Sequence, residues 1–180
     1  AVKNKNMKES AYTGNARVPS FASKLYRDEE RAFWREFGDY VRSQPWGRRI
    51  LGVHCGYGGS GDGMPCGANC MPDTGRRMTE AFRRYLAEKY GSDDALRKAW
   101  GDGTVTLAGA GVPDRTLRCG SGMYLRDISD PRDRRVADYY DCYHKVFAKF
   151  MIDFGDAVKS ALPGRLVGAY FGYYILGYSP

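Results

Sequence analysis

The residues with the clearest potential for chemistry gather around one glycine-rich segment. Asp62 lies within residues 55–75, which contain seven glycines and two prolines and follow a short apolar run that ends at His54. A carboxyl group in such a loop can exchange a proton with a bound substrate, and an imidazole can hydrogen-bond a hydroxyl group. Both residues also have a structural interpretation, because Asp beside Gly is common in turns and a histidine at a strand end can have its hydrogen bonds satisfied locally.

Aromatic side chains accompany this segment. Tyr57 follows the first apolar run, and Tyr170 and Tyr173 belong to a second run near the end of the chain. Tyrosine combines a large apolar ring with a polar tip, which suits contact with the face of a sugar, although packing is its commoner role. We therefore treat Asp62 as the candidate catalytic residue, and His54 with the three tyrosines as candidate substrate-binding residues.

The five cysteines do not define a disulfide framework or a metal site. Their number is odd, so at least one is unpaired within a monomer. Cys66 and Cys70 have the spacing of half a zinc site, but a structural zinc ion needs four ligands, and the others would have to come from Cys119 or the two histidines. The second histidine, His144, lies within a helical pattern and is expected at the surface. No metal and no cofactor are expected.

Charge and hydropathy exclude two further classes of protein. The net charge is +7, but the basic residues are scattered, and arginine pairs such as Arg83-Arg84 lie beside acidic residues, as on solvated helix faces. The sequence therefore does not predict a nucleic-acid interface. No apolar run reaches the roughly 18 residues of a membrane-spanning helix, and no motif for a serine nucleophile or a phosphate-binding loop is present.

The apolar pattern predicts an alternation of helices and buried strands. A polar loop is expected over residues 1–24, and an irregular excursion with one short strand, at 104–107, over residues 101–129. Helices are expected from Asp28 to Pro45, over 75–90, from Ser92 to Gly101 and from Asp130 to 162. Strands that are apolar on both faces are expected at 49–54 and 166–171. This order predicts an α/β fold with ligands at the carboxyl ends of the strands.

Several motifs in this order resemble the β-galactosidase-like glycoside hydrolases related to family 42. A Gly-x-His strand, Gly52-Val53-His54, precedes Gly58-Gly59-Ser60-Gly61-Asp62, and a Phe…Tyr-Leu…Lys-Tyr-Gly…Leu…Ala-Trp-Gly run follows over residues 82–101. Flanking similarities bring the coverage to about residues 18–176; they are Pro19-Ser20-Phe21-Ala22-Ser23, Asp138-Tyr139-Tyr140 and Val167-Gly168-Ala169-Tyr170-Phe171-Gly172-Tyr173.

The resemblance implies a segment of a (β/α)8 TIM-type barrel spanning residues 25–180. It places Asp62 where the family has its general acid/base Glu. Asp is one methylene shorter, which moves the carboxyl group by about 1 Å and can cost on the order of a hundredfold in rate. A retaining glycosidase also needs a second carboxyl group roughly 5 to 5.5 Å away. In the family this nucleophile lies on a later strand, and a barrel needs about 200 residues or more, so we expect an incomplete barrel without its nucleophile.

Two functional interpretations remain open at this point. The first is a glycosidase fragment, acting on β-linked glycosides in its parent protein and inactive alone. The second is a non-catalytic carbohydrate-binding or assembly module that uses the same glycine- and tyrosine-rich face. Both predict a carbohydrate partner, with self-association or the remainder of the barrel completing the fold. An extracellular or periplasmic location is slightly favoured over a cytoplasmic one.

Overall fold

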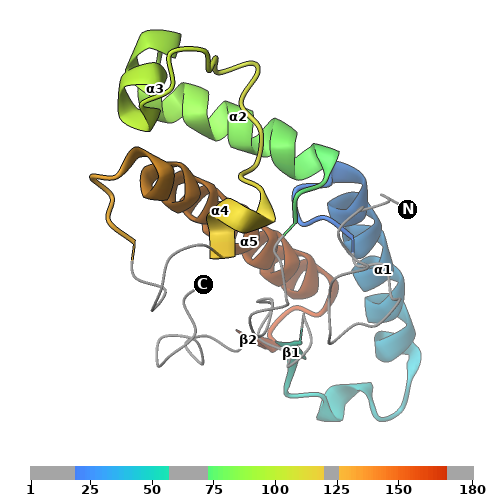
Figure 1. The fold of residues 1–180 in the computed structure, drawn as a ribbon. Coiled ribbons are helices and arrows are strands. Elements are labelled where there is room, and N and C mark those ends of the chain that lie inside the picture. The colour runs from blue at the N-terminus through green and yellow to red at the C-terminus, as the bar shows by residue number, and fades with distance from the viewer. Residues whose placement is uncertain (1–18, 57–72, 120–125, 170–180) are drawn as a thin grey trace.

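The chain forms helices and a small parallel sheet (Figure 1). The computed structural model describes residues 19–56, 73–119 and 126–169. In chain order the elements are α1 (Lys24–Ser43), the 3-10 turn η2 (Gly47–Arg49), β1 (Gly52–Cys55), α2 (Arg76–Tyr90), α3 (Asp93–Trp100), α4 (Arg115–Cys119), α5 (Pro131–Ala161) and β2 (Leu166–Ala169). The fold is therefore mixed helix and strand, as the sequence predicts.

Most helix boundaries lie at the expected capping residues. Ser92 and Asp130 accept hydrogen bonds from backbone N–H groups in the first turns of α3 and α5. Gly91 and Gly101 end α2 and α3 with φ angles of 70° and 58°, a left-handed conformation that glycine adopts without strain. These signals are local, which is why the sequence shows them.

The first helix begins earlier than its apolar pattern predicts. It starts at Lys24 and not at Asp28, because the Ser23 hydroxyl accepts a hydrogen bond from the Tyr26 backbone N–H at 3.3 Å. Ser23 and the preceding Ser20 are buried, so this end of the predicted polar loop is packed against the protein.

The excursion after α3 differs from its prediction in two ways. Thr104 and Leu107 lie in turns and the two residues between them are irregular, so the predicted short strand is wrong. A short helix, α4, lies where none is expected. Side chains of the neighbouring helices bind the backbone here: Arg97 Nε donates to the Val105 carbonyl at 3.0 Å, and Arg83 Nε donates to the Ala110 carbonyl at 2.8 Å. These hydrogen bonds replace strand pairing as the means of satisfying buried backbone groups.

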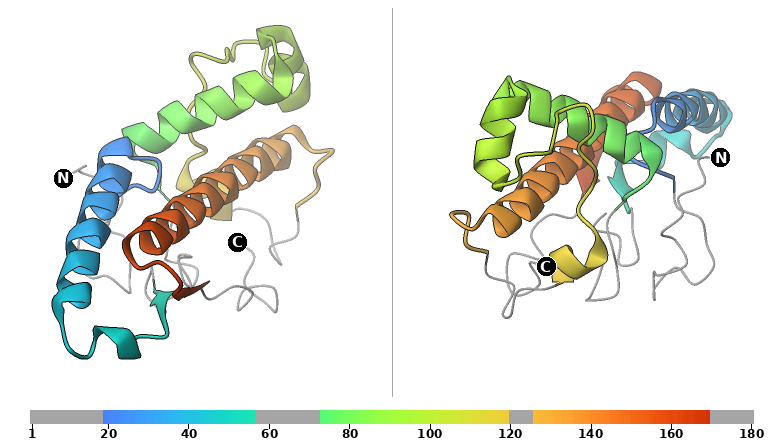
Figure 2. Two further views of the ribbon diagram at one scale, coloured as in Figure 1. Left: turned by 180° about the vertical axis from the view of Figure 1, so that it is seen from behind. Right: turned by 45° about the horizontal axis from the view of Figure 1, so that its top comes forward.

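Helix α5 is the centre of the molecule, in contact with α1, α2, α3, α4 and β2 (Figures 1 and 2). Its amino-terminal half packs against α2 and α3, and its carboxyl-terminal half packs against α1 and leads into β2. The main core is aromatic: Phe82, Trp100, Tyr139 and Phe150 are each 3% exposed or less. His144 on α5 is exposed, which confirms its expected surface position.

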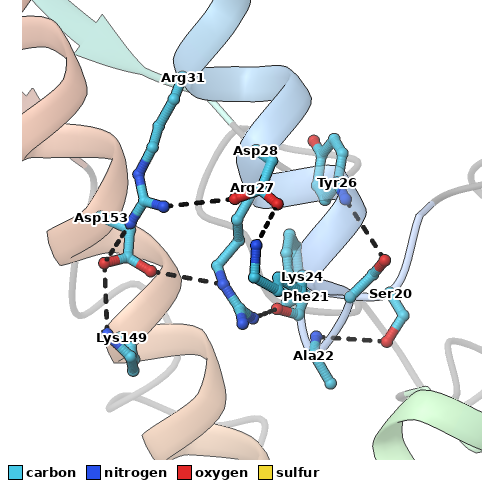
Figure 3. Close-up of polar contacts among 11 residues, drawn as sticks. Ser20, Phe21, Ala22, Lys24, Tyr26, Arg27, Asp28, Arg31, Lys149 and Asp153 are labelled. Atoms are coloured by element: carbon cyan, nitrogen blue, oxygen red, sulfur yellow. Dashed lines mark hydrogen bonds and ion pairs between the residues drawn. The ribbon is translucent and has the colours of Figure 1, made fainter.

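Charged side chains and a close backbone approach hold α1 against α5. Figure 3 shows Asp153 of α5 between Arg27 and Arg31 of α1, with ion-pair distances of 3.4 and 3.2 Å. Near the other end of the pair, Gly38 faces Ala161 so closely that a Cβ at Gly38 would lie 2.7 Å from the Ala161 carbonyl oxygen. The two helices therefore sit in a fixed relation beside the strands.

The strands β1 and β2 pair in parallel, with Gly52 opposite Leu166 and His54 opposite Gly168. Alternate residues face opposite sides, and the side that carries Cys55 is covered by Trp34 of α1 and by Phe154 and Val158 of α5. The other side differs from the expected burial on both faces: within the described residues, Leu166 remains 75% exposed. A partial barrel is thus compatible with the strand pair, but what the described residues establish is the coarser mixed fold with a small parallel sheet.

Candidate functional site

The candidate site lies at the carboxyl ends of β1 and β2, where parallel α/β folds bind their ligands. One of the sequence-predicted site residues is described, namely His54 on β1. The other four lie outside the described residues; they are Tyr57, Asp62, Tyr170 and Tyr173. In the sequence Tyr57 is two residues beyond the end of β1, and Tyr170 is the residue directly after β2.

His54 occupies the strand face that points away from the helices. Its neighbours in sequence, Val53 and Cys55, belong to the clusters on the helix side, and side chains alternate along a strand. The imidazole lies across the opposing residue of β2, because a Cβ added to Gly168 would be 3.1 Å from His54 Cδ2 and 3.7 Å from Nε2. Gly168 therefore leaves the space that the exposed imidazole uses.

On the helix side of the same strand end, the side chain of Cys55 is buried. Cys55 is 3% exposed, and its Sγ lies 3.7 Å from Met151 Sδ. Burial, together with the nearby carboxylate of Glu30, raises the pKa of the Cys55 thiol to about 12. Glu30 itself accepts a hydrogen bond from Trp34 Nε1 at 3.2 Å. A thiol in this environment stays protonated at neutral pH, so Cys55 is a packing residue and not a nucleophile.

Cys55 and Cys142 are the cysteines whose side chains the structure describes, and both are free and buried. Cys142 is buried in the main core, and burial raises its pKa to about 12 as well. Within the described ranges there is no cluster of three or more His, Cys, Asp or Glu side chains that could hold a metal ion. Cys66 and Cys70, the pair with half the spacing of a zinc site, lie outside those ranges.

A buried carboxylate that the sequence does not single out organises the helical part. Asp138 of α5 is 1% exposed and accepts hydrogen bonds from Lys89 Nζ at 2.8 Å, from the Tyr90 hydroxyl at 2.7 Å and from Trp100 Nε1 at 2.8 Å. Burial and the hydrogen bond to Asp138 raise the pKa of Tyr90 above its usual value, so the phenol remains a donor. We call this set of four residues the Asp138 network.

The Asp138 network explains part of the motif that carries the family resemblance. Lys89-Tyr90-Gly91 and Ala99-Trp100-Gly101 supply its three donors, and Asp138-Tyr139-Tyr140 supplies its acceptor. These motifs therefore fix how α2, α3 and α5 pack. The helical pattern gives no local signal for Asp138, because it lies about 200° around the helix from Val136 and so outside the apolar stripe that runs through Val136 and Phe147.

The described part of the chain is thus an α/β protein whose strand pair is helix-covered on one face. No family model and no curated protein matches the sequence. A solved structure with a similar fold is the β-galactosidase of the psychrophilic Marinomonas ef1, with 21% sequence identity and a TM-score of 0.57. The match covers 85% of this chain and 21% of that chain, so the chain spans about a fifth of the length of the enzyme it resembles. At this identity the similarity is one of fold.

Membrane insertion by a helix finds no support in the described residues, since no helix there has both the length and the apolar character needed to cross a bilayer.

Proposed function

We propose that the chain is a segment of a glycoside-hydrolase-like (β/α) barrel whose parent protein acts on β-linked glycosides. The observation that carries this proposal is the strand pair: two parallel strands, joined through a chain segment that includes α5, have helices on one face and His54 on the other. Neighbouring strands of a (β/α) barrel have this arrangement, with helices outside and inward-pointing side chains on the opposite face. The fold similarity to a β-galactosidase supports the same assignment.

In this proposal the carboxyl ends of the two strands form part of the sugar site. Asp62 is the candidate general acid/base, and His54 is the described residue that would hydrogen-bond a sugar hydroxyl. Tyr57, Tyr170 and Tyr173 follow the same strand ends in sequence and would provide ring surfaces for the sugar.

The second carboxyl group would come from elsewhere in the parent protein. Neither Gly52–Gly56 nor Leu166–Ala169 contains an acidic residue. Two carboxylates of α5 are held by other side chains: Asp138 accepts from three donors, and Asp153 pairs with Arg27 and Arg31. Because glycoside cleavage with retention needs two carboxyl groups about 5 to 5.5 Å apart, the chain alone is expected to bind sugar without cleaving it.

The first experiment titrates the chain with galactose and follows the two histidines by NMR. His54 lies on the proposed sugar face, whereas His144 lies on α5 beside the rings of Tyr140 and Tyr143 and serves as an internal control. We expect saturable shifts of the His54 ring signals and constant His144 signals. Equal shifts of both histidines, or none, would contradict a sugar site at the strand ends.

The second experiment assays the chain with activated aryl β-glycosides, alongside the Asp62→Ala variant and the control Asp94→Ala, an exposed position on α3. No turnover is expected from any of the three. Hydrolysis that is lost in Asp62→Ala and retained in Asp94→Ala would mean that a second carboxyl group lies within this chain. In the longer parent protein, Asp62→Glu is expected to raise the rate of glycoside hydrolysis. If the parent protein binds sugar but hydrolyses no glycoside, with or without the Asp62→Glu change, the alternative of a non-catalytic carbohydrate-binding module is favoured.

A further inference from the structure

A cavity of about 670 Å³ lies at the amino ends of the two strands, opposite to the proposed sugar site. It is bounded by the two connections that lead from a helix into a strand, 44–51 after α1 and 162–165 after α5. The apolar side chains of Val41, Leu162 and Pro163 form part of its wall, and three arginines also line it: Arg42, Arg48 and Arg165.

Two glycines fix the chain on either side of this cavity. A Cβ at Gly47 would lie 2.0 Å from the Val41 carbonyl oxygen, so this turn packs directly on the end of α1. Gly164 has a φ of 78°, in the left-handed region, and lets the chain turn from α5 into β2. An arginine follows each glycine, so Arg48 and Arg165 emerge from constrained backbone and not from flexible loop tips.

The three arginines differ in how their charge is balanced. Arg42 pairs with Asp39 and also donates to the Ala161 carbonyl at the end of α5. Arg48 and Arg165 have no ion pair or side-chain hydrogen bond with any described residue. The carboxyl ends of α1 and α5 contribute roughly half a negative charge each, which does not neutralise two full positive charges. Among the described residues, the cavity therefore keeps an excess of positive charge beside the side chains of Val41, Leu162 and Pro163.

We propose that this cavity binds the phosphate monoester of a small organic molecule. A phosphate monoester carries a charge of about −1.5 to −2 at neutral pH, which matches the charges of Arg48 and Arg165, and the planar guanidinium group forms paired hydrogen bonds with phosphate oxygens. The volume lies within the roughly 300 to 1,000 Å³ of small-molecule sites, far above the need of a phosphate ion, so the apolar wall has room for an organic group of about sugar size. This inference does not depend on the proposed function, because it concerns the opposite ends of the strands.

Calorimetric titration of the whole chain with glucose 6-phosphate tests the proposal, with glucose and inorganic phosphate as the comparison ligands. We expect saturable binding of the sugar phosphate, weaker binding of inorganic phosphate and no binding of glucose. Arg48→Ala and Arg165→Ala are each expected to raise the dissociation constant about tenfold or more, the loss of a charged hydrogen bond.

The matched control is Arg49→Ala, which removes the next positive charge of the same 3-10 turn from a residue that does not line the cavity. It is expected to leave the dissociation constant unchanged. The three substituted arginines, Arg48, Arg49 and Arg165, are at least partly exposed, and circular dichroism checks that each variant keeps its helices. Equal weakening by Arg49→Ala and Arg48→Ala would overturn the proposal, because it would reduce the effect to net charge. Absence of saturable binding, or equal affinity for sugar phosphate and inorganic phosphate, would overturn it as well.

Discussion

Replacement of Asp138 by Asn tests whether the Asp138 network holds the helices together. Asn keeps the shape of Asp but has one acceptor oxygen where Asp138 uses two, one for Lys89 and one shared by Tyr90 and Trp100. The amide nitrogen of Asn would then face Lys89 Nζ, which now lies 2.8 Å from a carboxylate oxygen. One charged hydrogen bond is lost, and Lys89, whose side chain is 33% exposed, can turn its ammonium group to water.

The expected loss is about 1.5 to 3 kcal/mol of unfolding free energy for Asp138→Asn, the range for a hydrogen bond to a charged group. Asp138→Ala should cost about 3 to 5 kcal/mol, because it leaves the buried indole N–H of Trp100 and the Lys89 charge without their acceptor. Stabilities of typical domains are 5 to 15 kcal/mol, so the Ala variant is expected to be partly unfolded at physiological temperature.

Urea denaturation followed by circular dichroism measures both losses. Asp156→Asn is the control, because Asp156 is an exposed residue on the same helix α5 and has no partner among the described residues. It should change stability by less than about 0.5 kcal/mol. An Asp138→Asn variant within that same margin would refute the reasoning, since it would mean that packing alone orients α2, α3 and α5.

Three further predictions concern other parts of the chain. Gly38→Ala is expected to destabilise the protein by about 1 to 3 kcal/mol, because its Cβ would lie 2.7 Å from the Ala161 carbonyl oxygen. Gly155→Ala should stabilise α5 by about 0.5 to 1 kcal/mol, because its Cβ would meet nothing closer than 3.9 Å. Urea denaturation measures both changes, and the same sign for both would contradict this prediction. The pKa of Asp102 is lowered to about 2, chiefly by the hydrogen bond from the Thr104 hydroxyl, so the Asp102 carboxylate stabilises the folded state above its unfolded pKa near 3.8. The difference in melting temperature between wild type and Asp102→Asn should therefore disappear as the pH falls from about 4 to about 2. A difference that stays constant over this range would contradict the prediction. Leu51 and Leu166, at the start of the strand pair, are largely exposed, so we expect the chain to self-associate. Light scattering that gives a monomer at every concentration would contradict this prediction.

The features that the sequence predicts well are those set by neighbouring residues. Ser92, Gly91 and Gly101 mark helix ends because a cap needs only a hydroxyl or a positive φ within one turn of chain. Both strands were predictable from short apolar runs bounded by turns, and the structure places them over 52–55 and 166–169. The location of α1 was less clear, because Ser23 lies inside a polar stretch that shows no periodicity.

The features that the sequence does not predict depend on distant residues. The partners of Asp138 lie 38 to 49 positions away along the chain, so no local pattern pairs them. An apolar run does not say how many of its faces are covered, and Leu166 proves to be largely exposed in the described structure. The candidate site was predicted through His54 and its flanking residues, and the space that Gly168 provides for the imidazole depends on strand register, which the sequence does not specify.

The position of the Asp138 network leads us to expect that the two ends of α5 differ in local stability. The network ties the amino-terminal half of α5 to α2 and α3, while the carboxyl-terminal half of α5 packs against α1 and the strands. Parts of a protein open locally with different free energies, and buried hydrogen-bond networks belong to the parts that open last. Native-state hydrogen exchange should therefore find slow amides around Val136–Cys142 and faster ones in β1 and β2. A transient opening that frees the strand pair would leave a three-helix remnant, so the strand end can rearrange around a partner without loss of the helical part.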